Sequence, residues 1–323
     1  MKLMTTASPK TENRTVVAVE GLTKRYGSIT AVDSLSFDVP VGQVIGLLGP
    51  NGAGKTTAMK MLLGLVKPTS GRATVLGAAH TSPEYVDAIQ RVGALIEAPA
   101  LYERLSARRN LELQARALGI SSDPARFDEL LELVDLTDRA DDAARTYSLG
   151  MKQRLGIAVA MIGKPDLVIL DEPANGLDPA GIVDIRNLLR RLPDMGTTVL
   201  VSSHQLAEVQ QACDRLVVLD QGRVIASGTT DEIVAGHTSS NDFTVRVEPS
   251  EITTAVDQLR DHAVNVSSGD HDSLTVVLPD GWSGRELNRI LVDAGVYAAE
   301  LVPETTTLES AFLTMTGANN ENS

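Results

Sequence analysis

Apolar residues along this chain fall into short runs, and the spacing within each run distinguishes strands from helices. Strands are predicted where a short apolar or alternating run is bounded by glycine or polar residues. These runs cover residues 16–20, 29–37, 44–48, 73–76, 92–96, 167–170, 198–202, 216–219 and 223–227. Helical patterns separate several of the later runs, and strands that alternate with helices predict a mainly parallel sheet. The Gly222 turn between the last two runs predicts a hairpin.

A helical insert interrupts this α/β pattern between residues 99 and 145. Its first helix is expected to begin after Ser106, because serine commonly caps the N-terminus of a helix. A second apolar stripe follows at helical spacing over residues 130–136. We therefore predict one α/β domain over residues 15–235 that carries a helical subdomain.

The last quarter of the chain has the pattern of a separate module. Residues 236–241 are polar and rich in residues that break helices and strands, which is typical of a linker. Strand and helix patterns then alternate, at residues 243–247, 252–259, 274–278, 283–292 and 308–315. From residue 241 onward there are 14 acidic side chains against 4 arginines and no lysine, so this part carries most of the net charge of −13. We expect a small acidic α+β domain over residues 242–318, with residues 1–14 and 319–323 disordered.

Composition argues against several classes of protein. No apolar run approaches the roughly 18 residues that a membrane-spanning helix needs, so the chain is not expected to act as a channel or carrier by itself. Residues 1–14 contain no apolar core of signal-peptide length. Cys213 is the only cysteine, which rules out an intrachain disulfide. The negative net charge argues against electrostatic capture of nucleic acid or anionic lipid.

A glycine-rich loop lies between the predicted strand at 44–48 and a helical pattern at 56–66. It matches G-x-x-x-x-G-K-[ST], a pattern whose backbone N–H groups surround a phosphate while the helix dipole adds positive charge. Lys55 is expected to reach the β- and γ-phosphates of ATP, and the Thr56 hydroxyl is expected to bind Mg²⁺. The residues expected to contact nucleotide here are Gly49, Pro50, Asn51, Gly52, Ala53, Gly54, Lys55, Thr56 and Thr57.

Two adjacent acids, Asp171 and Glu172, follow the apolar strand at 167–170. Functional residues commonly lie at the carboxyl ends of strands in an open parallel sheet. Asp171 is placed to hold Mg²⁺, and Glu172 is placed to take a proton from a water that attacks the γ-phosphate. Taken alone, the pair favours a solvated turn after a strand. Beside a phosphate loop, it predicts nucleotide hydrolysis.

With these motifs the chain resembles the ATP-binding cassette (ABC) transporter ATPases, from about residue 16 to residue 235. The resemblance implies an α/β P-loop fold, with a mainly parallel sheet and a helical insert, followed here by the small α+β domain. It also implies that Tyr26 stacks on adenine and that His204, which follows the strand at 198–202, contacts the γ-phosphate. The alternatives are an ordinary tyrosine at a strand end and a structural histidine.

The stretch 147–154 is similar to the family signature that precedes a helix. In the family this signature meets the γ-phosphate of nucleotide held by the opposite subunit, so Ser148 and Gly150 would face an anion there. Asp178 ends an Asn-Gly-Leu-Asp stretch that resembles the loop running between the two cassettes. Because one chain has one phosphate loop and one signature, the resemblance implies a head-to-tail homodimer.

Two departures from the commonest family pattern stand out. The usual signature is Leu-Ser-Gly-Gly-Gln, whereas Leu149 stands here in place of the first glycine and Met151 in place of the glutamine. After the strand at 92–96 the family usually has a glutamine close to Mg²⁺ and the attacking water, and Glu97 holds that place here. We hypothesise that Glu97 does the glutamine's work and links nucleotide state to the membrane partner. The alternative is a solvent-facing glutamate without a catalytic part.

The resemblance also implies a separate transmembrane permease, through which this cytoplasmic subunit would lie on the inner face of the membrane. The signature, Glu97 and the acidic extension together resemble detached ATPase subunits of exporters of antibiotics, lantibiotics or lipids. An importer ATPase is the nearer alternative. A soluble ABC ATPase acting on ribosomes or DNA is disfavoured by the single cassette and the acidic charge, and no nucleic-acid partner is expected. A P-loop kinase or GTPase is disfavoured because no guanine-reading Asn-Lys-x-Asp motif follows.

Overall fold

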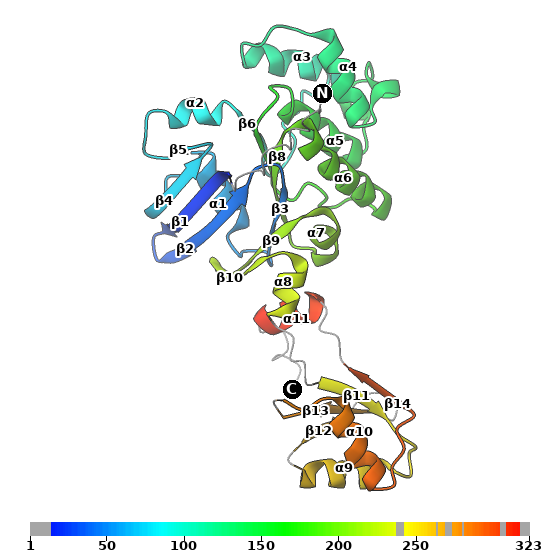
Figure 1. Cartoon of the computed structure of the whole chain (residues 1–323). Coiled ribbons are helices and arrows are strands. Elements are labelled where there is room, and N and C mark those ends of the chain that lie inside the picture. The colour runs from blue at the N-terminus through cyan, green and yellow to red at the C-terminus, as the bar shows by residue number, and fades with distance from the viewer. Residues whose placement is uncertain are drawn as a thin grey trace, which may run out of the picture. The chain divides into compact units, whose positions relative to one another are not determined.

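The computed structural model describes residues 14–236, 242–262, 264–268, 273–279, 281–303 and 308–316. The chain divides into two compact units, Met1–Thr230 and Asp231–Ser323 (Figure 1). Three of the predicted segments fall on residues that are not described. These are the lead-in apart from Arg14, the linker apart from Gly236, and the tail at 319–323.

A six-stranded sheet forms the centre of the first unit (Figure 1). Its neighbouring strands are, in order, β10 (Arg223–Gly228), β9 (Arg215–Asp220), β3 (Val44–Leu48), β8 (Thr198–Ser203), β7 (Leu167–Leu170) and β6 (Val92–Leu95). All neighbours are parallel except the β9–β10 hairpin, which turns at Gly222 as predicted. Every residue of β3, β7 and β8 is buried, which explains their continuous apolar sequence. The predicted mainly parallel sheet is confirmed.

A second, antiparallel sheet of four strands belongs to the same unit. Its order is β2 (Ile29–Pro40), β1 (Thr15–Tyr26), β4 (Ser70–Val75) and β5 (Ala78–Ala79). The sequence predicted that the first strand ends at Glu20, but the strand continues to Tyr26. A shift of register between Glu20 and Thr23 includes Gly21, whose φ is +57°, so this break in the pattern is a bulge rather than a strand end.

Helix α1 (Lys55–Leu62) follows the phosphate loop and is shorter than the predicted 56–66. Gly64 has a φ of +72°, and the N–H of Leu65 donates to the Lys60 carbonyl, so the chain leaves the helix through a left-handed residue. The short helix α2 (Tyr85–Ile89) was not predicted. Met59 and Leu62 of α1 belong to the apolar core that also contains side chains of both sheets.

The predicted helical insert is present as α3 (Ala107–Ala117) and α4 (Pro124–Leu133), with two short 3₁₀ turns, Thr137–Arg139 and Ala144–Thr146. Ser106 caps α3 as expected, because its hydroxyl accepts from the N–H of Arg109 at 3.3 Å. The remaining helices of the unit are α5 (Leu149–Ala160), α6 (Pro179–Arg191) and α7 (Leu206–Ala212), with a 3₁₀ turn at Pro193–Met195.

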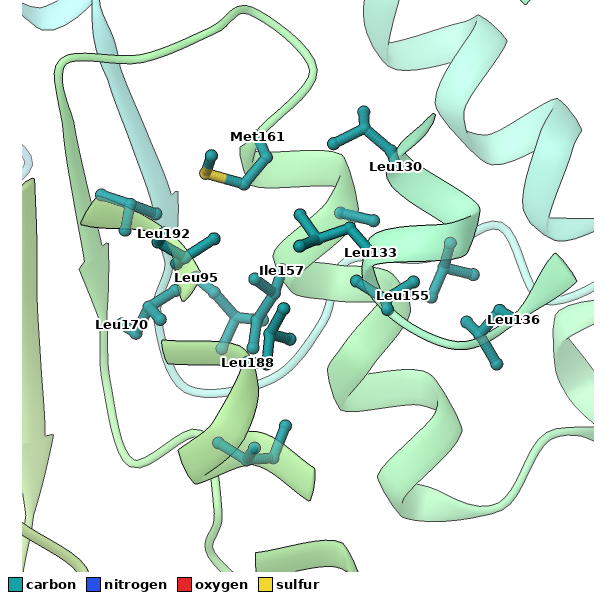
Figure 2. Packing of buried hydrophobic residues seen from close by; sticks show 14 of the residues in the cluster. Leu95, Leu130, Leu133, Leu136, Leu155, Ile157, Met161, Leu170, Leu188 and Leu192 are labelled. Carbon is teal, nitrogen blue, oxygen red and sulfur yellow. The ribbon is translucent and has the colours of Figure 1, made fainter. Parts of the chain in front are cut away.

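One continuous apolar core joins the insert to the parallel sheet. Figure 2 shows side chains of this core, with Ile157 and Leu188 near Leu95 and Leu170, and with Leu130, Leu133 and Leu155 farther from the strands. These residues come from α4, α5, α6, β6 and β7. Because this core contains side chains of the insert as well as of β3, β6, β7 and β8, the insert is packed onto the parallel sheet.

The second unit contains an antiparallel four-stranded sheet of order β12-β13-β11-β14. Its elements follow the chain as β11 (Asp242–Arg246), α9 (Ile252–Asp261), β12 (Asn265–Ser268), β13 (Ser273–Val277), α10 (Gly284–Asp293) and β14 (Glu300–Pro303). This succession and strand order are those of the ferredoxin-like split βαβ motif. Helices α8 (Thr230–Ala235) and α11 (Leu308–Thr316) flank it in sequence. The edge strands β12 and β14 were not predicted, because edge strands of this length carry only part of an apolar pattern.

The described residues contain no helix that is both long and apolar enough to span a bilayer.

The core in Figure 2 leads to a test of how the insert is held. Leu155 on α5 is 0% exposed, so Leu155→Ala is expected to lower the free energy of unfolding by about 2–5 kcal/mol through lost contacts and a cavity. Leu65, which is 65% exposed, supplies the control, and Leu65→Ala should cost less than about 0.5 kcal/mol. Calorimetric unfolding of the whole chain measures both, and equal shifts in melting temperature would contradict the assigned core.

Candidate active site

The phosphate loop turns directly from β3 into α1 and has little room for side chains. A Cβ atom at Gly49 would lie 2.3 Å from the Leu219 carbonyl oxygen, and one at Gly54 would lie 2.5 Å from the Ala31 carbonyl oxygen. Gly52 and Gly54 also have φ values of +86° and +97°, which L side chains rarely adopt. The N–H of Gly222 donates to Ala53 at 3.1 Å, so the β9–β10 turn supports the loop from outside. The glycines of the predicted motif are therefore required by its backbone path.

Lys55 opens α1 and is 5% exposed. Its ammonium donates to the carbonyl oxygens of Gly49 at 2.6 Å and Pro50 at 3.2 Å, and it forms an ion pair with Glu172 Oε1 at 3.1 Å. An ammonium group has three protons to donate, so these three partners satisfy it fully. Lys55 therefore points back over the loop, toward the place where the pattern predicts phosphate.

Thr57, in the same helical turn, is half-buried.

Asp171 follows β7 and is 3% exposed. Its Oδ2 accepts from the Thr56 hydroxyl at 2.8 Å, and its Oδ1 accepts from the Ser202 hydroxyl at 2.6 Å. Mg²⁺ is usually held by one or two carboxylates, together with substrate phosphates and waters. The Thr56 and Asp171 oxygens fit this donor set, because they face each other at the start of α1. Among the described residues no cluster of three or more acidic, histidine or cysteine side chains offers a self-sufficient metal site.

Glu172 is the centre of the site's contacts. Its Oε1 faces Lys55, and its Oε2 lies 2.8 Å from Nδ1 of His204, which comes directly after β8. Its backbone has a φ of +49°, an uncommon conformation for a residue with a Cβ, and its N–H donates to the Ser202 hydroxyl at 2.9 Å. The ends of β3, β7 and β8 thus bring Lys55, Glu172 and His204 together, as the sequence placed them.

Glu97 follows β6 and also has a left-handed backbone, with a φ of +67°. Its carboxylate pairs with the ammonium of Lys60 at 2.5 Å, and its side chain remains 67% exposed. This hydrogen bond raises the pKa of Lys60. The counter-charge of Glu97 in this structure is thus a lysine of α1.

The residues expected to serve a second subunit lie on other helix ends. The Ser148 hydroxyl accepts from the Met151 N–H at the start of α5, and Asp178 Oδ1 accepts from the Gly181 N–H at the start of α6. A Cβ atom at Gly150 would lie 3.8 Å from Leu177, so the two helix starts are neighbours. Within residues 14–236 no hydrogen bond or ion pair joins Ser148, Gly150 or Asp178 to Lys55 or Glu172.

Tyr26 ends β1 and is 49% exposed, with the ammonium of Lys24 4.8 Å from the centre of its ring. About half of the surface of Tyr26 is therefore open to solvent.

Sequence reasoning missed two contacts of the site. Ser202 bridges the two acids, because its hydroxyl donates to Asp171 and accepts from the backbone of Glu172. Lys60 lies four residues after Thr56, which places it on the same face of α1 one turn later. That spacing was a usable signal for Lys60. Nothing local in the sequence pointed to Ser202, because its two bonds depend on how β7 and β8 pair.

Comparison with known proteins agrees with this geometry. The ABC transporter family matches residues 32–175. The daunorubicin resistance ATP-binding protein DrrA3 of Streptomyces coeruleorubidus is 40% identical, across 94% of this chain and 96% of its own. The bacitracin transport ATP-binding protein BcrA of Bacillus licheniformis is 34% identical, across 94% of this chain and 98% of its own.

Solved structures give the same result over about two thirds of the chain. A structure described as the ATP-binding subunit of an ABC transporter is 33% identical with a TM-score of 0.60, and the match covers 68% of this chain and 92% of that one. A dimeric ATP-binding cassette in a post-hydrolysis state, bound to ADP and Pi, is 25% identical with a TM-score of 0.59, covering 66% of this chain and 98% of that one.

Phosphate loop, paired acids and histidine thus stand together at one edge of a sheet, in a chain that aligns with ABC ATPases over nearly its whole length. The chain belongs to the ABC transporter ATP-binding proteins, and it is an ATP-binding and ATP-hydrolysing subunit of such a transporter.

Proposed function

We propose that this subunit drives the export of a drug, peptide or lipid through a separate membrane permease. The relatives support export, since two that align along 94% of the chain are named for bacitracin transport and daunorubicin resistance. The observation that carries the catalytic part is the contact of Glu172 with both Lys55 and His204. The Glu172 carboxylate thereby contacts the ammonium of Lys55 and the imidazole of His204, which follows β8.

During hydrolysis each of these residues has a separate task. Lys55 turns from Glu172 to the β- and γ-phosphates, and Glu172 then accepts a proton from the water that attacks the γ-phosphorus. His204 donates to the γ-phosphate as negative charge develops there. The N–H groups of the loop from Gly49 to Gly54 and the start of α1 hold the phosphates in place. Tyr26 stacks on the adenine ring.

Mg²⁺ fits the oxygens of Thr56 and Asp171, and Glu97 is a third candidate once it leaves Lys60. When bound, the ion supplies positive charge that offsets the charge of the phosphates. The chain's own part is to hold these oxygens at the start of α1. Ser202 fixes the orientation of the Asp171 carboxylate from the opposite side.

The complete site includes a second copy of this chain. Ser148 and Asp178 cap the N-termini of α5 and α6, and Gly150 lies in the first turn of α5, which suits contact with nucleotide bound by a partner subunit. A head-to-tail homodimer therefore forms two composite sites. When ATP closes the dimer, the surface near Glu97 and the helical insert transmits this movement to a cytoplasmic helix of the permease. Binding to the permease keeps the subunit at the inner face of the membrane.

Dimerisation provides a test of the composite site. Glu172→Gln removes the base but keeps its shape, so turnover should fall by about 10²- to 10⁴-fold while ATP binding remains. ATP should then hold the variant as a dimer, which light scattering detects with and without Mg²⁺. Lys55→Ala is the matched control and should remain monomeric because it loses phosphate contact. A Glu172→Gln protein that binds ATP and stays monomeric would contradict the composite site.

The role of Glu97 is tested by varying the Mg²⁺ concentration. If the Glu97 carboxylate contributes to metal binding, Glu97→Gln should raise the Mg²⁺ concentration for half-maximal ATPase activity severalfold. Lys60→Met should lower it, because it frees that carboxylate from its ion pair. Thermal unfolding should hardly change in either variant, since an exposed ion pair contributes about 0–1 kcal/mol. Two variants that match the unaltered protein would leave Glu97 as a solvent-facing side chain.

A further inference from the structure

A glutamate behind the site has no assigned part in hydrolysis. Glu208 lies on α7, four residues after His204, and is half-buried. Its Oε2 accepts from the Ser203 hydroxyl at 2.7 Å, while its Oε1 is buried without a hydrogen-bond partner. Leaving a carboxylate oxygen buried and unpaired is costly, so such a group calls for an explanation.

Three hydrogen bonds of Ser203 connect Glu208 with the segment that carries His204 and with the phosphate loop. Its hydroxyl accepts from the Gln205 N–H at 2.9 Å and donates to Glu208, which fixes the backbone on either side of His204. Its carbonyl oxygen accepts from the Gly49 N–H at 3.3 Å, at the first glycine of the phosphate loop. The segment that presents His204 is therefore tied to the loop by its backbone and to α7 by the Ser203–Glu208 bond.

The surroundings of Glu208 give this bond its importance. A small cavity of about 20 Å³ lies beside it, with walls that are mainly apolar and include Ile182, Ile185 and Val209. That volume accommodates about one water molecule, so the segment would have space to shift if the bond were lost. Arg186 lines the same cavity, but its guanidinium bonds Gln211. Burial raises the pKa of Glu208, in keeping with a carboxyl group that has few polar neighbours.

We propose that Glu208 is a positioning residue for hydrolysis, which holds His204 against Glu172 through its hydrogen bond to Ser203. This inference rests on the proposed roles of Glu172 and His204. Glu208 bonds Ser203 and lies behind the Lys55–Glu172–His204 contacts, so its loss should affect the geometry of the transition state more than the binding of ATP.

The experiment compares Glu208→Ala with Glu208→Gln in the full chain. Alanine removes the acceptor for Ser203, whereas glutamine retains one in its side-chain carbonyl. We expect kcat to fall by about 10- to 100-fold in Glu208→Ala, since small misplacements of catalytic groups have effects of this size, with KM for ATP unchanged. Glu208→Gln should restore most of the rate. Gln210→Ala, at an exposed position of the same helix, is the control and should leave kcat unaltered.

Ser203→Ala removes the same bond from its other end and guards against a Glu208 variant that fails to fold. If the two residues act through one bond, the double variant should lose no more than either single variant. Unchanged kcat in Glu208→Ala, equal losses in the alanine and glutamine variants, or additive losses in the double variant would each overturn the inference. His204→Ala separates the two proposals, because full activity in that variant would remove the role of His204 itself.

Discussion

The ion pair and hydrogen bond of Glu172, to Lys55 and to His204, are the contacts on which the arrangement of this site depends. They require three strands to end at the same edge of the sheet. The parallel register provides this, because it pairs Leu48 with Ser203 and Leu170 with Val201. A shift of β7 by one residue would exchange the faces on which its side chains lie. The buried apolar strands therefore position these three side chains as well as stabilise the fold.

Two residues of the site have a left-handed backbone, one after β6 and one after β7. Glu97 follows β6 with a φ of +67°, and Glu172 follows β7 with a φ of +49°. Such conformations cost of the order of 1–3 kcal/mol each and persist only where the surroundings hold them. The Ser202 hydroxyl holds the backbone of Glu172, and Lys60 holds the side chain of Glu97. Both carboxylates are thus aimed by neighbours from other elements.

The sequence predicted the parallel sheet, the helical insert and the cluster of Lys55, Asp171, Glu172 and His204, because periodicity and local motifs carry this information. It did not show that β1 continues beyond Glu20, since a bulge and a strand end share the same local residues. Ser202 and Glu208 were also missed. Their contacts depend on how β7, β8 and α7 pack, and a serine or glutamate in isolation has many ordinary explanations. The spacing of Lys60 after Thr56 places it on the same face of α1, but nothing in the sequence showed that Lys60 pairs with Glu97.

Charge balance connects this arrangement with the proposed reaction. Lys55 is buried, and its ammonium would be strongly destabilised without an anionic partner, so in this structure the Glu172 carboxylate serves as that partner. The β- and γ-phosphates carry more negative charge than a single carboxylate, and the helix dipole and loop N–H groups also favour them at that place. In the proposed reaction, phosphate at Lys55 would therefore displace Glu172 from it. The proposed base would then become available to the attacking water only once the γ-phosphate is in place, so the Glu172 carboxylate would not stand without a counter-charge beforehand.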